Sequence, residues 1–171
     1  SSDLVADQLI VIDTGSTDGT VEIARKHGAE IHSYEWNDHF ADARNFSLQF
    51  ARGDWVLILD ADEELMSGTR KDLLTDMTCA NALGLRIPLL NKQTADSGAS
   101  FVPRLFRNAP GICFIGRVHE QAFSSVLAQG RRWGMGLSLG KATIMHHGYS
   151  PEIKQSKDKV KRNLRLLEMA L

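Results

Sequence analysis

The chain has 171 residues, 43% of them hydrophobic and 24% charged, with 20 basic and 21 acidic side chains and a formal net charge of −1. This length allows one sizeable hydrophobic core. The balanced charge gives no reason to expect binding to nucleic acid. No apolar run reaches the roughly 18 residues of a membrane-spanning helix, so the sequence predicts no transmembrane segment. Cys79 and Cys113 match no metal-ligand spacing and are expected to be buried free thiols.

In the first half of the chain, predicted strands and helices alternate. The expected elements are a strand at 9–12, a helix at 20–27 capped by Gly28, a strand at 30–33, a helix carrying Phe40, Ala43, Phe46 and Phe50 on one face and ending at Gly53, a strand at 55–59, and a helix at 69–77. Such alternation predicts an α/β fold with a mostly parallel central sheet and helices on both faces.

The second half has a different pattern. Shorter strands are expected at 84–90, 101–106 and 143–145, separated by the polar stretch 91–100 and the glycine-rich stretch 130–140. Antiparallel additions or a mobile loop would both fit this pattern. A helix is predicted from Pro151 to Leu171, with an apolar stripe and a basic face. The basic face contains Lys154, Lys157, Lys159, Lys161, Arg162 and Arg165. A solvated helix face is the ordinary explanation for such a run.

The first strand is followed by the loop DTGSTDGT, residues 13–20. In an open parallel sheet, ligands bind at the carboxyl ends of the strands, and a Gly/Ser/Thr-rich turn that opens a helix presents backbone N–H groups to them. The loop lacks the Gly-Lys-Ser/Thr ending of a phosphate-binding P-loop. A plain turn capped by Ser16 or Asp18 is the alternative.

The strand at 55–59 runs directly into the acidic sequence Asp60-Ala61-Asp62-Glu63-Glu64. Residues i and i+2 of an extended segment point the same way, so Asp60 and Asp62 are expected to converge on a hard cation such as Mg²⁺ or Mn²⁺. A lone D-x-D arises often by chance. Its position, at the sheet edge where the first loop also emerges, favours a metal site.

These loops lie within two longer blocks, VIDTGSTDGTVEIARKHGAEI (11–31) and NDHFADARNFSLQFARGDWVLILDADEEL (37–65). Together the blocks closely resemble family 2 glycosyltransferases of the GT-A fold, especially a bacterial subgroup that often carries tetratricopeptide repeats. The likeness continues more thinly through RLFRN (104–108), GRVHEQ (116–121), IMHHGY (144–149) and KRNLRLLE (161–168).

The resemblance implies a nucleotide-sugar donor, UDP- or GDP-linked, and a Mn²⁺ or Mg²⁺ ion. It places residues of the first loop, namely Asp13, Thr14, Gly15 and Ser16, against the base and ribose, although many relatives have an acidic residue in place of Thr14. It places Arg44 near the diphosphate, Asp60 and Asp62 at the donor ribose and the cation, and His146 in the metal sphere, with His147 as an open alternative.

The same resemblance implies single-displacement, inverting transfer, in which the cation offsets charge on the leaving diphosphate. Asp62 would then act catalytically through the metal, and an acidic base would take the proton of the acceptor hydroxyl. GRVHEQ supplies Glu120 as that base and His119 as a substrate-binding neighbour. A salt bridge from Glu120 to Arg117 or another basic residue is the structural alternative.

The family's fold normally begins with one more strand, and only residues 1–8 precede the first strand here, so that strand is expected to be missing. We expect a catalytic domain over 1–150 and a basic amphipathic helix over 151–171, which could begin a further helical region. The acceptor is open among glycans, lipid-linked glycans and peptides. The expected location is the cytoplasm, with peripheral attachment to the inner membrane left open.

Two other functions compete with this one. A GT-A-like domain could have lost its donor site and serve as a scaffold. LILDADEE also suggests a haloacid-dehalogenase-type phosphatase with Asp60 as nucleophile, but Glu64 stands where that family needs Thr or Val.

Overall fold

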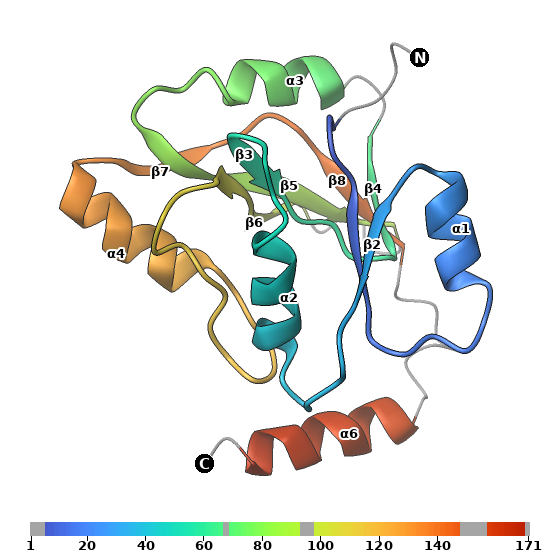
Figure 1. Ribbon diagram of the computed structural model, residues 1–171. Coiled ribbons are helices and arrows are strands. Elements are labelled where there is room, and N and C mark those ends of the chain that lie inside the picture. Colours follow the sequence, from blue (N-terminus) through green and yellow to red (C-terminus); the bar gives the residue numbers. More distant parts are fainter. Residues whose placement is uncertain (1–5, 67–68, 93–97, 148–156, 170–171) are drawn as a thin grey trace.

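The structure is a computed structural model that describes residues 6–66, 69–92, 98–147 and 157–169. Its first part is a small parallel sheet of two strands, β1 (Ile10–Asp13) and β2 (Glu30–Ser33), joined by helix α1 (Thr20–Lys26) (Figure 1). The C-cap residue of α1 is His27, and Gly28 follows with a φ of 77°. A positive φ suits glycine, so the predicted C-terminal cap is confirmed.

The larger sheet has six strands. They are β3 (Trp55–Leu57), β4 (Glu63–Leu65), β5 (Ala82–Asn91), β6 (Ser100–Arg107), β7 (Gly136–Leu139) and β8 (Ile144–His146). Five of them follow the order β3-β6-β5-β8-β4, and β7 also pairs with β5. The pairs β3/β6, β5/β6 and β4/β8 are antiparallel, whereas β5/β7 and β5/β8 are parallel.

The predicted mostly parallel sheet is therefore wrong, because the sheet is mixed. A parallel neighbour needs a crossover of a dozen or more residues. The connection from β5 to β6 is too short for that, so these two long strands form an antiparallel hairpin. The absence of the family's first strand stays a prediction, as does the domain boundary at 150.

Helices pack on both faces of the larger sheet, as predicted. Helix α3 (Thr69–Asp76) covers one face through Leu73, which packs with Leu85, Leu105 and Ile144. Helices α2 (Phe40–Leu48) and α4 (Phe123–Trp133) cover the other face. They contribute Ala41 and Val126 to a second hydrophobic core cluster. Members of that core include Leu83, Phe106, Ile112 and Phe114. Adjacent residues of β6, Leu105 and Phe106, thus serve opposite faces, as strand geometry requires.

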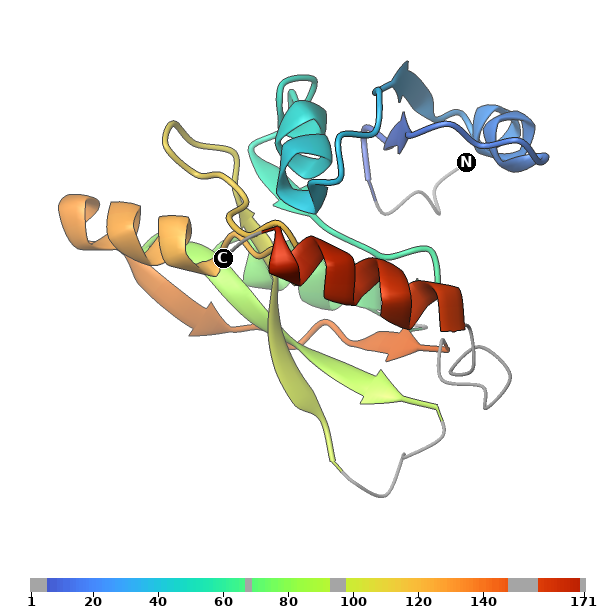
Figure 2. The same cartoon turned by 90° about the horizontal axis from the view of Figure 1, so that it is seen from below.

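Helix α6 (Lys157–Glu168) lies across the molecule near the start of α2 (Figure 2). Leu166 is fully buried, and Arg165 Nη2 donates to Asp38 Oδ1 at 2.6 Å. The Arg162 guanidinium lies 5.3 Å from the centre of the Phe40 ring. The side chains of Lys154, Lys157, Lys159 and Lys161 in the predicted basic face lie outside the described residues, as does the predicted helix start at Pro151. Within the described part of the chain, no helix is both long and apolar enough to cross a bilayer.

Three elements were not predicted, and one ends early. Strand β4, helix α4 and strand β7 occupy segments expected to be loop, since α4 and β7 together run through the glycine-rich stretch. Helix α2 ends at Leu48 rather than near Gly53. Phe50 leaves the helical face and stacks on His32 of β2, with ring centroids 3.5 Å apart. The two cysteines are free, but half-buried rather than buried.

Gly130 explains why a helix passes through a glycine-rich stretch. It is buried in α4, and a Cβ there would lie 2.6 Å from the Met135 carbonyl oxygen. Gly130→Ala should therefore lower the free energy of unfolding by about 1–3 kcal/mol through overpacking. This would outweigh the roughly 1 kcal/mol that alanine normally gains over glycine in a helix. Urea denaturation measures the change.

The exposed Ala128 of the same helix provides the control. Ala128→Gly should cost up to about 1 kcal/mol, because it changes only helix propensity. A Gly130→Ala variant more stable than the wild type would contradict the close approach of Met135.

Candidate functional site

Helix α2 brings Arg44 to the edge of the larger sheet. The next residue of the helix, Asn45, fixes α2 in this position. Asn45 Nδ2 donates to the Phe114 carbonyl at 3.0 Å, and Asn45 Oδ1 accepts the Phe114 N–H at 2.7 Å. The Phe114 ring lies 5.5 Å below the Arg44 guanidinium. A two-point amide bond and a cation–π contact therefore set the direction in which Arg44 points.

The acidic segment after β3 is a turn, not an extended strand end. The Glu63 N–H donates to the Asp60 carbonyl at 2.9 Å, and the Glu63 Oε2 accepts the Asp60 N–H at 2.9 Å. The expectation that Asp60 and Asp62 point the same way is therefore wrong, because the period of two holds only for extended backbone. Asp60 points to two arginines, whereas Asp62 points to His146.

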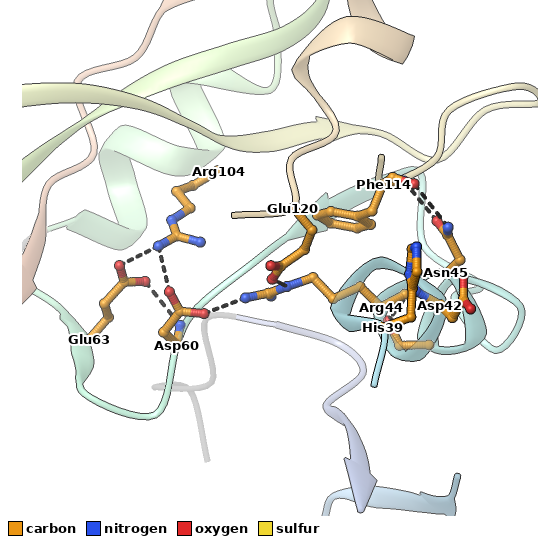
Figure 3. A network of polar contacts seen from close by, with 10 residues as sticks. His39, Asp42, Arg44, Asn45, Asp60, Glu63, Arg104, Phe114 and Glu120 are labelled. Atoms are coloured by element: carbon orange, nitrogen blue, oxygen red, sulfur yellow. Dashed lines mark hydrogen bonds and ion pairs between the residues drawn. The ribbon is translucent and has the colours of Figure 1, made fainter. Parts of the chain in front are cut away.

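Five charged residues form what we call the carboxylate–arginine network: Arg44, Asp60, Glu63, Arg104 and Glu120 (Figure 3). Arg44 Nη2 donates to Asp60 Oδ1 at 2.6 Å, and its Nε donates to Glu120 Oε1 at 2.5 Å. Arg104 Nη2 donates to Asp60 Oδ2 at 2.7 Å and to Glu63 Oε1 at 2.5 Å. Three carboxylates against two guanidiniums leave this cluster with one net negative charge.

Burial makes these pairs stronger than surface ion pairs. The Glu63 side chain is 2% exposed and that of Glu120 is 10% exposed. Burial alone would raise the pKa of Asp60, but the hydrogen bond from Arg44 and the charges of Arg104 and Arg44 outweigh it, so the pKa lies below its usual value. Burial would lower the pKa of Arg44, and its bonds to Asp60 and Glu120 raise it instead. Asp60 and Arg44 are thus both ionised at neutral pH.

Asp62 and His146 form a second pair beside this network. His146 Nε2 lies 3.2 Å from Asp62 Oδ2, and His146 Nδ1 lies 2.9 Å from Asn91 Oδ1. Antiparallel pairing of β4 with β8 produces this meeting, because it sets Glu63 opposite His146. The adjacent His147 instead contacts Glu64 at 2.9 Å. Among the described residues, no three His, Cys, Asp or Glu side chains are grouped as a metal site, so Asp60 does not join Asp62 and His146.

The first loop is ordered by its own side chains. Asp13 Oδ1 accepts the Ser16 N–H at 3.0 Å, and hydrogen bonds from Ser16 lower the pKa of Asp13. Asp18 Oδ1 accepts from the Thr20 N–H and hydroxyl. Asp18 thus satisfies the N–H of the first residue of α1, as the turn-capping alternative expects, although the N-cap position of the helix is Gly19. Thr14 and Gly15 lie within the turn that the bond between Asp13 and Ser16 closes, and Gly15 has a φ of 108°.

Glu120 lies in a closed loop before α4. The backbone groups of Ile115 and Gln121 exchange two hydrogen bonds of 3.1 Å, which close residues 116–120. Gly116 and His119 have φ values of 112° and 57°, and the left-handed conformation is uncommon for histidine. His119 is exposed, whereas Glu120 turns inward to Arg44. The predicted alternative partner of Glu120, Arg117, instead donates to the Asp38 carbonyl.

Sequence reasoning missed Glu63, Arg104 and Asn91. Arg104 stands in the block RLFRN, which was noticed without a role for the arginine. Glu63 was counted as one of several carboxylates in a row. Asn91 ends β5 and carries no local signal. Only the pairing of distant strands brings these three residues to the site.

A scan against protein families matches residues 4–84 to the family described as "Glycosyl transferase family 2". The chain contains a family 2 glycosyltransferase domain. The resemblance noted in the sequence is thus confirmed, and the match gives the phosphatase alternative no support. One relative is a TPR repeat-containing protein of Synechococcus elongatus, 36% identical over 95% of this chain but only 41% of its own length. This domain therefore spans less than half of that relative.

Solved structures of other proteins share the GT-A-like α/β fold. TarS of S. aureus (residues 1–349), solved with UDP-GlcNAc, matches with a TM-score of 0.64 and 17% identity over 93% of this chain and 56% of that chain. Glucosyl-3-phosphoglycerate synthase of Mycobacterium tuberculosis, solved with Mn²⁺ and UDP-glucose, matches with a TM-score of 0.54 and 16% identity, over 94% of this chain and 68% of that chain. At these identities the likeness concerns the fold alone.

Proposed function

We propose that this family 2 domain transfers a sugar, with inversion, from a nucleotide-diphosphate donor, with Mn²⁺ or Mg²⁺ held by Asp62 and His146. The observation that carries the proposal is the contact between Asp62 Oδ2 and His146 Nε2 beside the carboxylate–arginine network. The two structural neighbours support the donor class, since one was solved with UDP-GlcNAc and the other with UDP-glucose and Mn²⁺.

The chemistry of Asp62 and His146 fits a dication. Mg²⁺ prefers octahedral geometry with ligands at about 2.1 Å, so two neighbouring ligands lie about 3 Å apart. The 3.2 Å between Asp62 Oδ2 and His146 Nε2 agrees with that spacing. The carboxylate of Asp62 is a ligand type that suits both Mg²⁺ and Mn²⁺. Asp62 is 47% exposed, which leaves room for donor phosphates and water.

A bound dication would offset the negative charge that builds on the departing diphosphate. Arg44 is placed to orient the same diphosphate, because a guanidinium presents a planar fork that matches phosphate oxygens. Asp60 holds that fork from one side and Glu120 holds it from the other. We assign Asp60 to the donor ribose and to the orientation of Arg44, rather than to the metal.

Glu120 is the proposed general base, which takes the proton from the acceptor hydroxyl. Within the network it contacts Arg44 Nε, whereas Asp60, which precedes Asp62 by two residues, contacts Arg44 Nη2. His119 is the neighbouring exposed side chain in the same loop and would contact the sugar or acceptor. A single displacement would need this base on the face of the sugar opposite the leaving diphosphate.

The first loop would bind the nucleotide through Asp13, Thr14, Gly15 and Ser16. For the protein as a whole, we propose an acceptor that is a glycan, a lipid-linked glycan or a peptide. We also propose a cytoplasmic location. Both proposals draw only on the resemblance to the bacterial repeat-carrying subgroup noted in the sequence.

Asp62→Ala should abolish the Mn²⁺ dependence of donor binding. Isothermal titration calorimetry with UDP-sugars and GDP-sugars, with and without Mn²⁺, measures this. We expect the wild type to bind one nucleotide class at least ~10-fold more tightly with Mn²⁺, because an ion held by Asp62 and His146 would offset the negative charge of the diphosphate. The variant should bind with the same weak affinity in both conditions.

Asp54→Ala is the matched control, since Asp54 is exposed and lies on the turn before β3. It should behave like the wild type. Metal-independent binding that survives Asp62→Ala would refute the metal site. No donor binding by the full-length protein would favour a scaffold role instead.

A further inference from the structure

His146 is the last residue of β8, the middle one of three neighbouring strands. Its strand, β8, pairs with β4 on one side and β5 on the other, and Asn91 and Glu63 are the residues that face it in the two registers. The Lys92 N–H donates to the His146 carbonyl at 3.1 Å, and the His147 N–H donates to the Asp62 carbonyl at 2.8 Å. The backbone at His146 is therefore fixed from both sides, which leaves the direction of its ring to side-chain contacts.

The two ring nitrogens of His146 face two different oxygens. Nδ1 lies 2.9 Å from Asn91 Oδ1, and an amide oxygen can only accept, so Nδ1 carries the hydrogen of that bond. In the neutral ring, Nε2 then presents its lone pair to Asp62 Oδ2, 3.2 Å away. A lone pair and a carboxylate oxygen repel each other unless a cation lies between them, either the proton of a charged imidazolium or a metal ion that replaces that proton. This arrangement is what two ligands of one metal ion require.

We propose that Asn91 is a positioning residue that sets the tautomer and ring direction of His146 for binding a divalent cation. The inference rests on the proposed function, because it assumes the ion held by Asp62 and His146. The observation behind it differs from the one behind the proposed function: it is the contact of His146 Nδ1 with Asn91, the last residue of β5. Partners of this kind, which hold the far nitrogen of a metal-binding histidine, typically contribute 10–100-fold to metal affinity.

If Asn91 had a purely structural role, its replacement would change protein stability and not ion affinity. If its side chain only tied the ends of β5 and β8 together, its loss would lower stability without changing the ion affinity of the folded protein. Asn108 provides this comparison within the same chain, because its Nδ2 donates to the carbonyls of Ala51 and Gly53, away from Asp62 and His146.

The test is a titration of Mn²⁺, alone and with UDP, followed by electron paramagnetic resonance of the free ion. Asn91→Ala should weaken Mn²⁺ binding by about 10–100-fold. Asn91→Asp should retain the affinity, because its carboxylate accepts the same hydrogen bond from Nδ1. Asn108→Ala should leave the affinity unchanged, whatever its effect on stability.

Nitrogen-15 NMR of the imidazole gives a second measurement that needs no metal. The wild-type ring should carry its hydrogen on Nδ1, and Asn91→Ala should shift the population toward Nε2. Wild-type Mn²⁺ affinity in Asn91→Ala, with Asp62→Ala still impaired, would overturn the role of Asn91 and leave the proposed function standing. Equal Mn²⁺ affinity in the wild type and Asp62→Ala would overturn the metal site and, with it, this inference.

Discussion

Glu63→Ala is expected to lower the free energy of unfolding by about 3–5 kcal/mol, because it breaks a buried ion pair from one side. The lost carboxylate accepts from Arg104 Nη2 at 2.5 Å and from the Asp60 N–H at 2.9 Å. The Arg104 side chain is only 19% exposed, and its Nε already lacks a hydrogen-bond partner among the described residues. Arg104 would keep Asp60 as its remaining carboxylate. Urea or guanidinium denaturation measures the loss.

The adjacent glutamate supplies a matched control. Glu64 is 70% exposed and contacts His147, so Glu64→Ala should change stability by no more than about 1 kcal/mol. A loss in Glu63→Ala as small as that in Glu64→Ala would contradict the burial of the Glu63–Arg104 pair.

A double variant separates stability from function. Replacing both partners with apolar residues, as Glu63→Leu with Arg104→Met, removes the buried charges together and should recover much of the stability. Asp60 would still lose its bond from Arg104 and the Glu63 carboxylate that fixes its turn. Donor affinity should therefore stay weak in a protein that is stable again. Full recovery of donor binding would mean that the pair serves stability alone.

The first half of the fold could be predicted because its signals are local. The strand at 30–33 and the helix capped by Gly28 follow from apolar runs and a single glycine, and the structure has them within a residue. Strand β4 has no such signal, since two of its three residues are glutamates. It is a strand because its backbone pairs with β8, and its inward glutamate is neutralised by an arginine from β6.

In the second half of the chain, Gly130 has a role other than the predicted turn. The stretch 130–140 was expected to be loop because glycine usually marks turns. Gly130 instead lies within α4, where the chain returns so closely that a Cβ would meet the Met135 carbonyl. Glycine that permits close packing and glycine that permits a turn look identical in one sequence.

The candidate site also divides into residues that local sequence signals predict and contacts that only long-range pairing creates. Asp60, Asp62, Arg44, Glu120 and His146 could be named from the two blocks and the later motifs, but their grouping could not. Treating 60–62 as extended predicted one metal site with both aspartates, whereas the turn divides them between arginines and histidine. Which carboxylate pairs with which cation depends on strand register, and register is set by contacts far apart in sequence.

Glu120→Gln should lower turnover by at least ~100-fold while leaving donor affinity nearly unchanged. Glutamine has the shape of glutamate, and its amide oxygen can still accept from Arg44 Nε, so the position of Arg44 is kept. The amide cannot take a proton from an attacking hydroxyl. Calorimetry of UDP-sugar binding measures the affinity. Release of UDP, with water as acceptor, measures turnover without knowledge of the natural acceptor.

Two further variants complete the test of the base. Glu168→Gln makes the same chemical change at an exposed position of α6 and should leave both quantities unaltered. Glu120→Asp keeps a carboxylate on a shorter side chain and should retain more turnover than Glu120→Gln. If Glu120→Gln instead releases UDP at the wild-type rate, Glu120 serves only to hold Arg44. The proton must then leave through another group, for which the exposed His119 of the same loop is the next residue to replace.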